Sequence, residues 1–329
     1  MNTRERFRQI MHSGPVDRVP LLEEPIRPEV LEAWRGQGLK QDVDLSEFFS
    51  TDSCEWIEPD LEPRPAPQAS PSSESEAESL RVLWNPQDPD RLPEDWPDYL
   101  ARCRSSGGLR LLRVCRGMFL TLGVRDWETF ADVALRLACE TQIASRVMRI
   151  QGEFAARLAE RILEDLEIDA AVFVEPICDN HGPLVSPHMY EELALKSYQP
   201  ILDLLRRKGV ENLVFRTFAN ARLLLPRVLK YGFNCLWADE VNVAAMDYRD
   251  LRREFGPGLR LIGGIDLDKV REGEEATRKE IVEKVPPLLA EGGYLPMADG
   301  RIREDMPYKN YLYYRRLLGR ITQEFLLRR

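Results

Sequence analysis

Polar side chains follow the apolar runs of this 329-residue sequence, at the points where buried strands are expected to end. Three of them suit acid–base chemistry on an anionic molecule, because a carboxyl group transfers a proton and a guanidinium orients an anion: Asp52, Glu175 and Arg216. The side chains that we expect to bind substrate are Glu23, Arg27, Arg113, Arg116, Asp179, His181, Asn220, Asp239, Glu240 and Asp299. Two simpler interpretations stay open. Strand ends ordinarily meet polar loops, and the first three residues could form an ion network that only stabilises the fold.

The segment from Glu175 to His181 also contains Cys178, so it offers a carboxylate, a thiol and an imidazole to a metal ion. Its spacing matches no established ligand pattern. The glycine pairs at 263–264 and 292–293 are not followed by a phosphate-binding pattern. We therefore expect neither a bound metal nor a tightly bound cofactor.

The elements that must position these side chains alternate between strand and helix. Asp126 is placed to cap a long helix that runs to about residue 166 with one possible break, and Ser186-Pro187 begins another helix that Gly209 ends. The apolar runs that predict strands are residues 19–22, 52–57, 111–118, 169–174, 212–216, 233–237, 259–265 and 293–296. Eight strands in β/α alternation predict a single α/β domain over 1–329, a (β/α)8 TIM barrel with an N-terminal extension. The C-terminal ends of its strands would form the mouth that holds the polar residues.

Residues 62–78 interrupt this pattern with Pro, Ser and Glu and with almost no large apolar side chains. Such a segment cannot recover its ordering entropy by burial, so we expect a mobile insertion, poorly ordered or packed on the outside. The flanking runs 52–57 and 80–85 could pair as strands around it.

The charge balance excludes whole classes of partner. The formal net charge is −9, so no overall positive field attracts nucleic acid or an anionic membrane. No apolar run approaches the roughly 20 residues that cross a bilayer, and the first residues lack the apolar stretch of a signal peptide. The six scattered cysteines suit reduced, buried thiols. We expect a cytoplasmic protein.

Five segments, in order along the chain, carry a known pattern: NTRERFRQIMHSGPVDRVP, GPLVSPHMYEEL, LLPRVLKYGFNCLWADEVNVAAMDYRDLRREFG, LRLIGGIDLDKV and EGGYLPMADGRIREDMPYKNYLYY. Through them nearly the whole chain resembles the uroporphyrinogen decarboxylase superfamily, which includes methylcobamide methyltransferases and corrinoid-dependent O-demethylases. The resemblance implies a TIM barrel, in agreement with the strand count. It also implies an enzyme that either removes carboxyl groups or transfers methyl groups.

The sequence differs from the motifs of both the decarboxylases and the zinc-dependent methyltransferases of this superfamily. The arginine-rich segment that binds substrate carboxylates in the decarboxylases is LLEEPIRPEVLEAW here, and of its arginines only Arg27 remains. The decarboxylase histidine near the C-terminus is replaced by Asp299-Gly300, although Asp52 matches the catalytic aspartate. The zinc ligands of the methyltransferases fall in the segments 216–220 and 297–299, which contain no cysteine or histidine.

Three hypotheses follow. The first is an enzyme that transfers methyl from a small methylated donor to a corrinoid carried on a partner protein, with Glu175, Asp52 or Asp239 as general acid and Arg216 orienting the donor. The second is a cofactor-free decarboxylase of a carboxylated, uroporphyrinogen-like substrate. The third is a barrel that binds a ligand without turnover.

Overall fold

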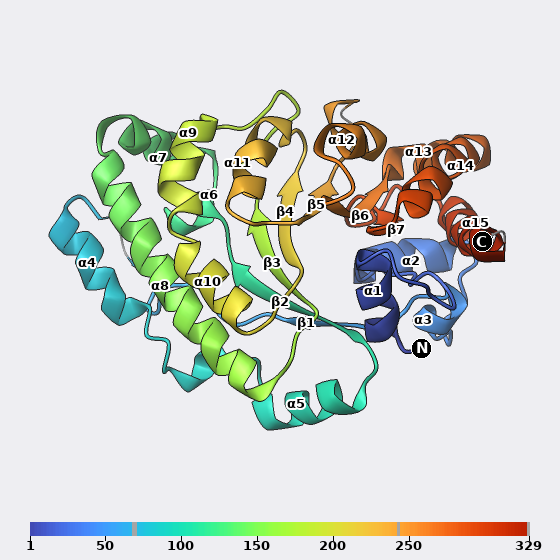
Figure 1. The fold of residues 1–329 in the computed structure, drawn as a ribbon, viewed down its shortest axis with the longest axis horizontal. Helices are drawn as coiled ribbons and strands as arrows, with labels where there is room; N and C mark the ends of the chain where they lie inside the picture. The colour runs from blue at the N-terminus through green and yellow to red at the C-terminus, as the bar shows by residue number, and fades with distance from the viewer. Residues whose placement is uncertain (68–70, 242–243, 328–329) are drawn as a thin grey trace. The chain divides into compact units, whose positions relative to one another are not determined.

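The computed structural model of the chain describes residues 1–67, 71–241 and 244–327, and it divides into two compact units. The first unit comprises residues 1–54, 107–109 and 235–329, and the second comprises residues 55–106 and 110–234. Each unit contains parallel strands accompanied by helices (Figure 1).

The second unit is built on parallel strands. They are β1 (Cys54–Ile57), β2 (Leu109–Cys115), β3 (Ala170–Glu175) and β4 (Leu213–Phe218). Their order follows the chain, and in β3 and β4 Val174 lies beside Arg216 and Glu175 lies beside Thr217. Nearly every residue of β3 and β4 is buried, as expected for strands covered on both faces. The C-terminal ends of these strands therefore lie at one edge of the sheet.

Helices cover this sheet, and α8 packs against both α4 and α10 (Figure 1). The helices of the second unit are α4 (Glu74–Leu83), η1 (Pro89–Arg91), α5 (Trp96–Ser105), α6 (Met118–Thr121), α7 (Trp127–Cys139), α8 (Thr141–Asp165), α9 (Pro187–Tyr190), η2 (Glu191–Leu195), α10 (Gln199–Arg207), η3 (Arg222–Leu224) and α11 (Leu225–Lys230). Asp126 caps α7, and Glu140 separates α7 from α8, so the prediction of a long helix with one break is confirmed. Ser186 caps α9, as predicted.

The first unit contains β5 (Cys235–Asp239), β6 (Arg260–Ile265) and β7 (Tyr294–Ala298), which are parallel and follow one another in order. Its helices are α1 (Thr3–Met11), α2 (Pro28–Gly36), α3 (Leu45–Phe48), η4 (Ala244–Met246), α12 (Tyr248–Phe255), α13 (Leu267–Glu272), α14 (Glu274–Glu291) and α15 (Tyr308–Leu327). The Tyr248 hydroxyl donates to the Ile262 carbonyl at 2.7 Å and accepts from the Ala238 amide at 2.8 Å, so it fixes α12 to β5 and β6.

The described residues contain seven strands instead of eight, so the prediction of a closed eight-stranded barrel is wrong, whereas the parallel α/β class is confirmed. The predicted first strand, residues 19–22, belongs to no strand or helix. The Leu21 amide donates to the Asp52 carboxylate at 2.8 Å instead of to a neighbouring strand.

The predicted strand over residues 80–85 is also wrong, because residues 74–83 form α4. Ser73 caps this helix by accepting from the Glu76 amide at 3.2 Å, and Ala77 and Leu80 are buried. The last part of the predicted insertion 62–78 is thus a packed helix, and residues 68–70 lie outside the described residues. In the part of the chain that the structure describes, no helix is both long enough and apolar enough to span a bilayer.

Candidate functional site

Glu175 is the last residue of β3 and is fully buried. Its Oε1 accepts from the Met118 amide at 2.9 Å and from the Tyr198 hydroxyl, whereas its Oε2 has no hydrogen-bond partner among the described residues. Burial raises the pKa of Glu175 to about 7, although the hydrogen bonds from Tyr198 and Met118 and the nearby Tyr190 hydroxyl oppose the shift. The carboxyl group therefore exchanges its proton near neutral pH.

The turn after β2 brings the Met118 amide to this carboxylate. Gly117 occupies that turn at φ +95°, and a Cβ there would lie 2.8 Å from Pro176 Cδ and 2.9 Å from the Val174 carbonyl oxygen. Only glycine fits so close an approach. The turn and the short helix α6 are thus shaped to bond Glu175.

Two thiols lie near the same carboxyl group. Burial raises the pKa of both Cys115 and Cys178 to about 12, and the proximity of Glu175 contributes to both shifts. Both thiols are protonated at neutral pH and are poor nucleophiles. Acid–base chemistry in this cluster therefore depends on Glu175.

Arg216 lies on the opposite face of the sheet from Glu175. Side chains alternate along a strand, and Arg216 lies beside Val174 in the register while Glu175 lies beside Thr217. The structure therefore does not bring Glu175 and Arg216 together, contrary to the prediction of one cavity around them. The Glu175 face carries Phe173, which packs on Tyr198 with ring centroids 5.4 Å apart, and so it is the face that the helices cover.

The Arg216 face carries the features of a binding surface. Arg113 lies beside Val172 in the register, so it shares this face with Arg216. The Arg216 guanidinium carbon lies 5.8 Å from the centre of the Trp56 ring, and an Arg113 Nη1 lies 3.6 Å from a Glu58 carboxylate oxygen. Two cations and an aromatic ring suit an organic anion. Trp56 was missed from the sequence, because a tryptophan in a short strand is ordinarily a packing residue.

The loops after β3 and β4 are joined through Asp179. Its Oδ1 accepts from the amides of His181 at 2.8 Å and Gly182 at 2.9 Å, and its carbonyl accepts from the Asn220 amide at 3.0 Å. These amides lower the pKa of Asp179. Asp179 and His181 are exposed, and the contacts of this loop are those of a turn. Substrate binding by these residues and by Asn220 stays a prediction.

In the first unit, Asp299 follows β7 and ties two loops together. Its Oδ2 accepts from the Val241 amide at 2.8 Å and its Oδ1 from the Leu267 amide at 3.0 Å. Burial raises the pKa of Asp299 to about 7, against these two hydrogen bonds. Asp239 ends β5 and is buried, and the exposed Glu240 forms an ion pair with Arg303 at 3.2 Å. Asp299 therefore holds the loops that contain Val241 and Leu267 together, which is a structural role.

Two further predicted residues hold the N-terminal segment of the first unit. Glu23 accepts from Arg315 Nη1 at 2.6 Å and from the Tyr314 hydroxyl, and it is buried with both partners. Arg27 donates to the Ile302 carbonyl at 3.2 Å and forms an ion pair with Glu29 at 3.4 Å.

Asp52 lies before β1, at the N-terminal end of the strand instead of the C-terminal end that we expected. Arg18 binds its carboxylate through Nη1 at 2.6 Å and through Nη2, and the Leu21 amide donates to it at 2.8 Å. Burial acts to raise the pKa of Asp52, but Arg18 and Leu21 outweigh it and the pKa is lowered. Asp52 is therefore held ionised, which suits an ion pair better than a proton donor.

Among the described residues, no group of three or more His, Cys, Asp and Glu side chains is arranged to hold a metal ion. In the segment where the sequence resemblance would place zinc ligands, Arg216, Phe218 and Asn220 cannot supply thiolate or imidazole. No step is therefore assigned to zinc.

No protein-family model matches the chain, and no curated protein matches it. Among solved structures, the chain is similar to a methyltransferase from Methanosarcina mazei, with a TM-score of 0.55 and 14% sequence identity. The match covers 98% of this chain and 99% of that chain. At this identity the likeness shows that the two chains share a fold over their whole length.

Proposed function

We propose that this protein is a methyltransferase that takes a methyl group from a small organic anion. The observation that carries the proposal is the arginine face of the second unit, where Arg113 and Arg216 share one side of the sheet and Trp56 lies beside Arg216. Guanidinium groups bind carboxylates, and an aromatic ring packs against the apolar body of the donor. The shared fold with a methyltransferase and the sequence resemblance to methyl-transferring members of a superfamily support the reaction class.

In this reaction the bond between the methyl carbon and the donor heteroatom breaks, and its electron pair stays on the heteroatom. The methyl carbon forms a bond to the acceptor, for which we propose a corrinoid on a separate protein, whose cobalt would supply the nucleophile. Arg216 stabilises the negative charge that grows on the leaving heteroatom. Because Glu175 faces the helices, we propose that it positions α6 by holding the Met118 amide.

The same arginines would also hold a carboxylate that leaves as carbon dioxide, so decarboxylation is the second candidate. In that reaction the bond to the carboxyl carbon breaks, and a proton replaces carbon dioxide on the substrate. The ion pair of Asp52 with Arg18 argues against it, because Asp52 is the residue to which the resemblance assigns the decarboxylase chemistry. A protein that binds a ligand without turnover is the third candidate.

The test uses purified full-length protein with free cob(I)alamin as methyl acceptor, and the cobalt absorbance reports methylation. We expect 4-methoxybenzoate to be a donor and its neutral counterpart 4-methoxybenzamide to be a poor one. Arg216→Gln should lower the rate more than tenfold, equivalent to about 1.4 kcal/mol of barrier, while Arg207→Gln, an exposed arginine of α10, should leave it unchanged.

Carbon dioxide release from uroporphyrinogen is measured in parallel. Release without cobalt methylation would replace the proposal by decarboxylation. The proposal would be overturned if neither cobalt methylation nor carbon dioxide release were observed. Equal methylation rates with 4-methoxybenzoate and 4-methoxybenzamide would overturn it as well.

A further inference from the structure

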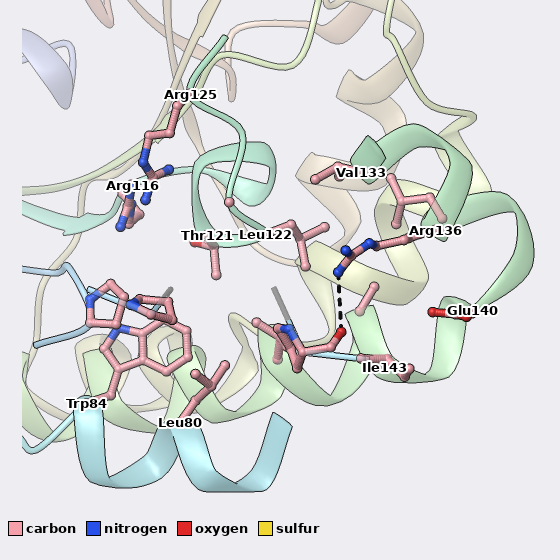
Figure 2. A pocket seen from close by; sticks show the side chains of 17 residues that line it. Leu80, Trp84, Arg116, Thr121, Leu122, Arg125, Val133, Arg136, Glu140 and Ile143 are labelled. Atoms are coloured by element: carbon pink, nitrogen blue, oxygen red, sulfur yellow. Dashed lines mark hydrogen bonds between the residues drawn. The ribbon is translucent and has the colours of Figure 1, made fainter. Parts of the chain in front are cut away.

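The second unit contains a cavity that the proposed reaction does not use. It has a volume of about 70 Å³ and lies between α4, α7, α8 and the segment after β2. Figure 2 shows its wall, with Leu80 of α4 and Trp84 directly after that helix on one side, and Val133 of α7 and Ile143 of α8 elsewhere around it. Neither Arg113 nor Arg216 lines it, so it is distinct from the arginine face.

Three arginines and one carboxylate, that of Glu140, interrupt this apolar wall. Arg116 and Arg125 lie together at one end of the cavity in Figure 2, and Arg136 lies at the other. Arg116 is only 5% exposed, and its Nε has no hydrogen-bond partner among the described residues. Arg136 donates to the Pro71 carbonyl at 3.4 Å. A buried guanidinium with an unused donor is costly unless something binds it.

Glu62 shows what the arginine end of the cavity accepts. Its Oε2 binds Arg116 Nη1 and lies 3.4 Å from Arg125 Nη2, so one carboxylate bridges two guanidinium groups. The Glu62 side chain is nevertheless 53% exposed, and it can move away without leaving a buried charge of its own. A carboxylate that entered the cavity could take its place.

From this arrangement we infer that the cavity binds a small carboxylate with a short branched aliphatic body. The carboxylate replaces Glu62 on Arg116 and Arg125, and the aliphatic body fills the space between Leu80, Trp84 and Val133. A volume of about 70 Å³ is several times what one water needs and about half of the 150 Å³ that accepts benzene. It therefore suits a body of about four carbons better than an aromatic ring.

The test is a ligand-observed NMR titration of the full-length protein with 3-methylbutanoate. Two comparison compounds separate the contributions: 3-methylbutanamide has the same shape without the charge, and acetate has the charge without the body. We expect the acid to bind with a Kd of about 1 mM or tighter, and each comparison compound at least about fivefold more weakly.

Three variants locate the site. Arg125→Gln should weaken binding about fivefold or more, and Arg125 is exposed enough for the variant to fold. Glu62→Gln should strengthen binding several-fold, because it removes the competing carboxylate. Arg207→Gln, outside the cavity, should change nothing, and thermal melting confirms that each variant folds.

Equal binding of the acid and the amide would overturn the inference, and so would weaker binding to Glu62→Gln. Because the titration measures binding alone, its result does not depend on whether the protein transfers methyl groups.

Discussion

Replacing Glu175 by glutamine should stabilise the protein strongly at pH 8 and only slightly at pH 5. The folded protein raises the pKa of Glu175 from an ordinary value of 4.5 to about 7. Between these two values the unfolded chain has released the proton while the folded protein retains it. The wild-type free energy of unfolding therefore falls as pH rises through this window, and it levels off above pH 7.

The magnitude follows from the shift. A difference of about 2.5 pKa units corresponds to about 3 kcal/mol, since each unit is worth 1.36 kcal/mol. Glutamine does not titrate, and its carbonyl oxygen accepts from Met118 and Tyr198 as Oε1 does. The difference between the variant and the wild type should thus grow from about 1 kcal/mol or less near pH 5 to about 3 kcal/mol at pH 8.

The assay is urea denaturation at pH 5, 6, 7 and 8, followed by circular dichroism and tryptophan fluorescence. Every other titrating group is common to both proteins, so it cancels in the difference at each pH. A difference that is independent of pH, or a variant less stable than the wild type at pH 8, would refute the physical account of Glu175.

Asp299→Asn provides the matched contrast. The pKa of Asp299 is also raised to about 7, but both of its oxygens accept from amides, those of Val241 and Leu267. Asparagine keeps one acceptor and places an amino group against the other amide. We expect a loss of about 1–3 kcal/mol at pH 5, where Glu175→Gln costs nothing.

Two further predictions concern hydrogen bonds to buried carboxylates. Tyr198→Phe removes a donor from Glu175, so denaturation curves should show a loss of about 1–2 kcal/mol that is larger at pH 8 than at pH 5, since an ionised acceptor gains more from the bond; equal losses at both values would contradict this. Arg315→Met leaves the buried Glu23 without its cation and the Phe49 carbonyl without its donor, so it should cost about 3–5 kcal/mol in the same assay, and a near-neutral result would contradict this account.

The apolar runs predicted β3 to β7 because those strands are buried on both faces, and burial leaves a continuous apolar signal in the sequence. Residues 19–22 carry the same signal, yet the Leu21 amide donates to the Asp52 carboxylate instead of to a neighbouring strand. The composition of residues 62–78 concealed the start of α4. The pair Ser73 and Glu76, a capping serine with an acid three residues later, was the signal that could have revealed the helix.

Composition and spacing could place Glu175 and Arg216 at strand ends, but the face of the sheet on which each lies depends on register. A shift of one residue in register moves every side chain to the other face, and an apolar run buried on both sides gives no alternation from which to read it. The structure resolves this: Glu175 turns towards Tyr198 and the helices, and Arg216 towards Trp56.

The two strand-end acids therefore differ in how many of their carboxylate oxygens accept hydrogen bonds from the backbone, and they do not differ in pKa. Glu175 and Asp299 titrate at about the same pH, but Asp299 accepts backbone amides on both oxygens and so joins two loops, whereas Glu175 accepts from Met118 and Tyr198 on Oε1 alone and meets only the Tyr190 hydroxyl besides. Asp299→Asn removes an acceptor from one of two backbone amides, whereas Glu175→Gln keeps the one oxygen that accepts from Met118 and Tyr198. Residue type and titration alone cannot distinguish a structural acid from one free to exchange a proton; the count of bonded oxygens can.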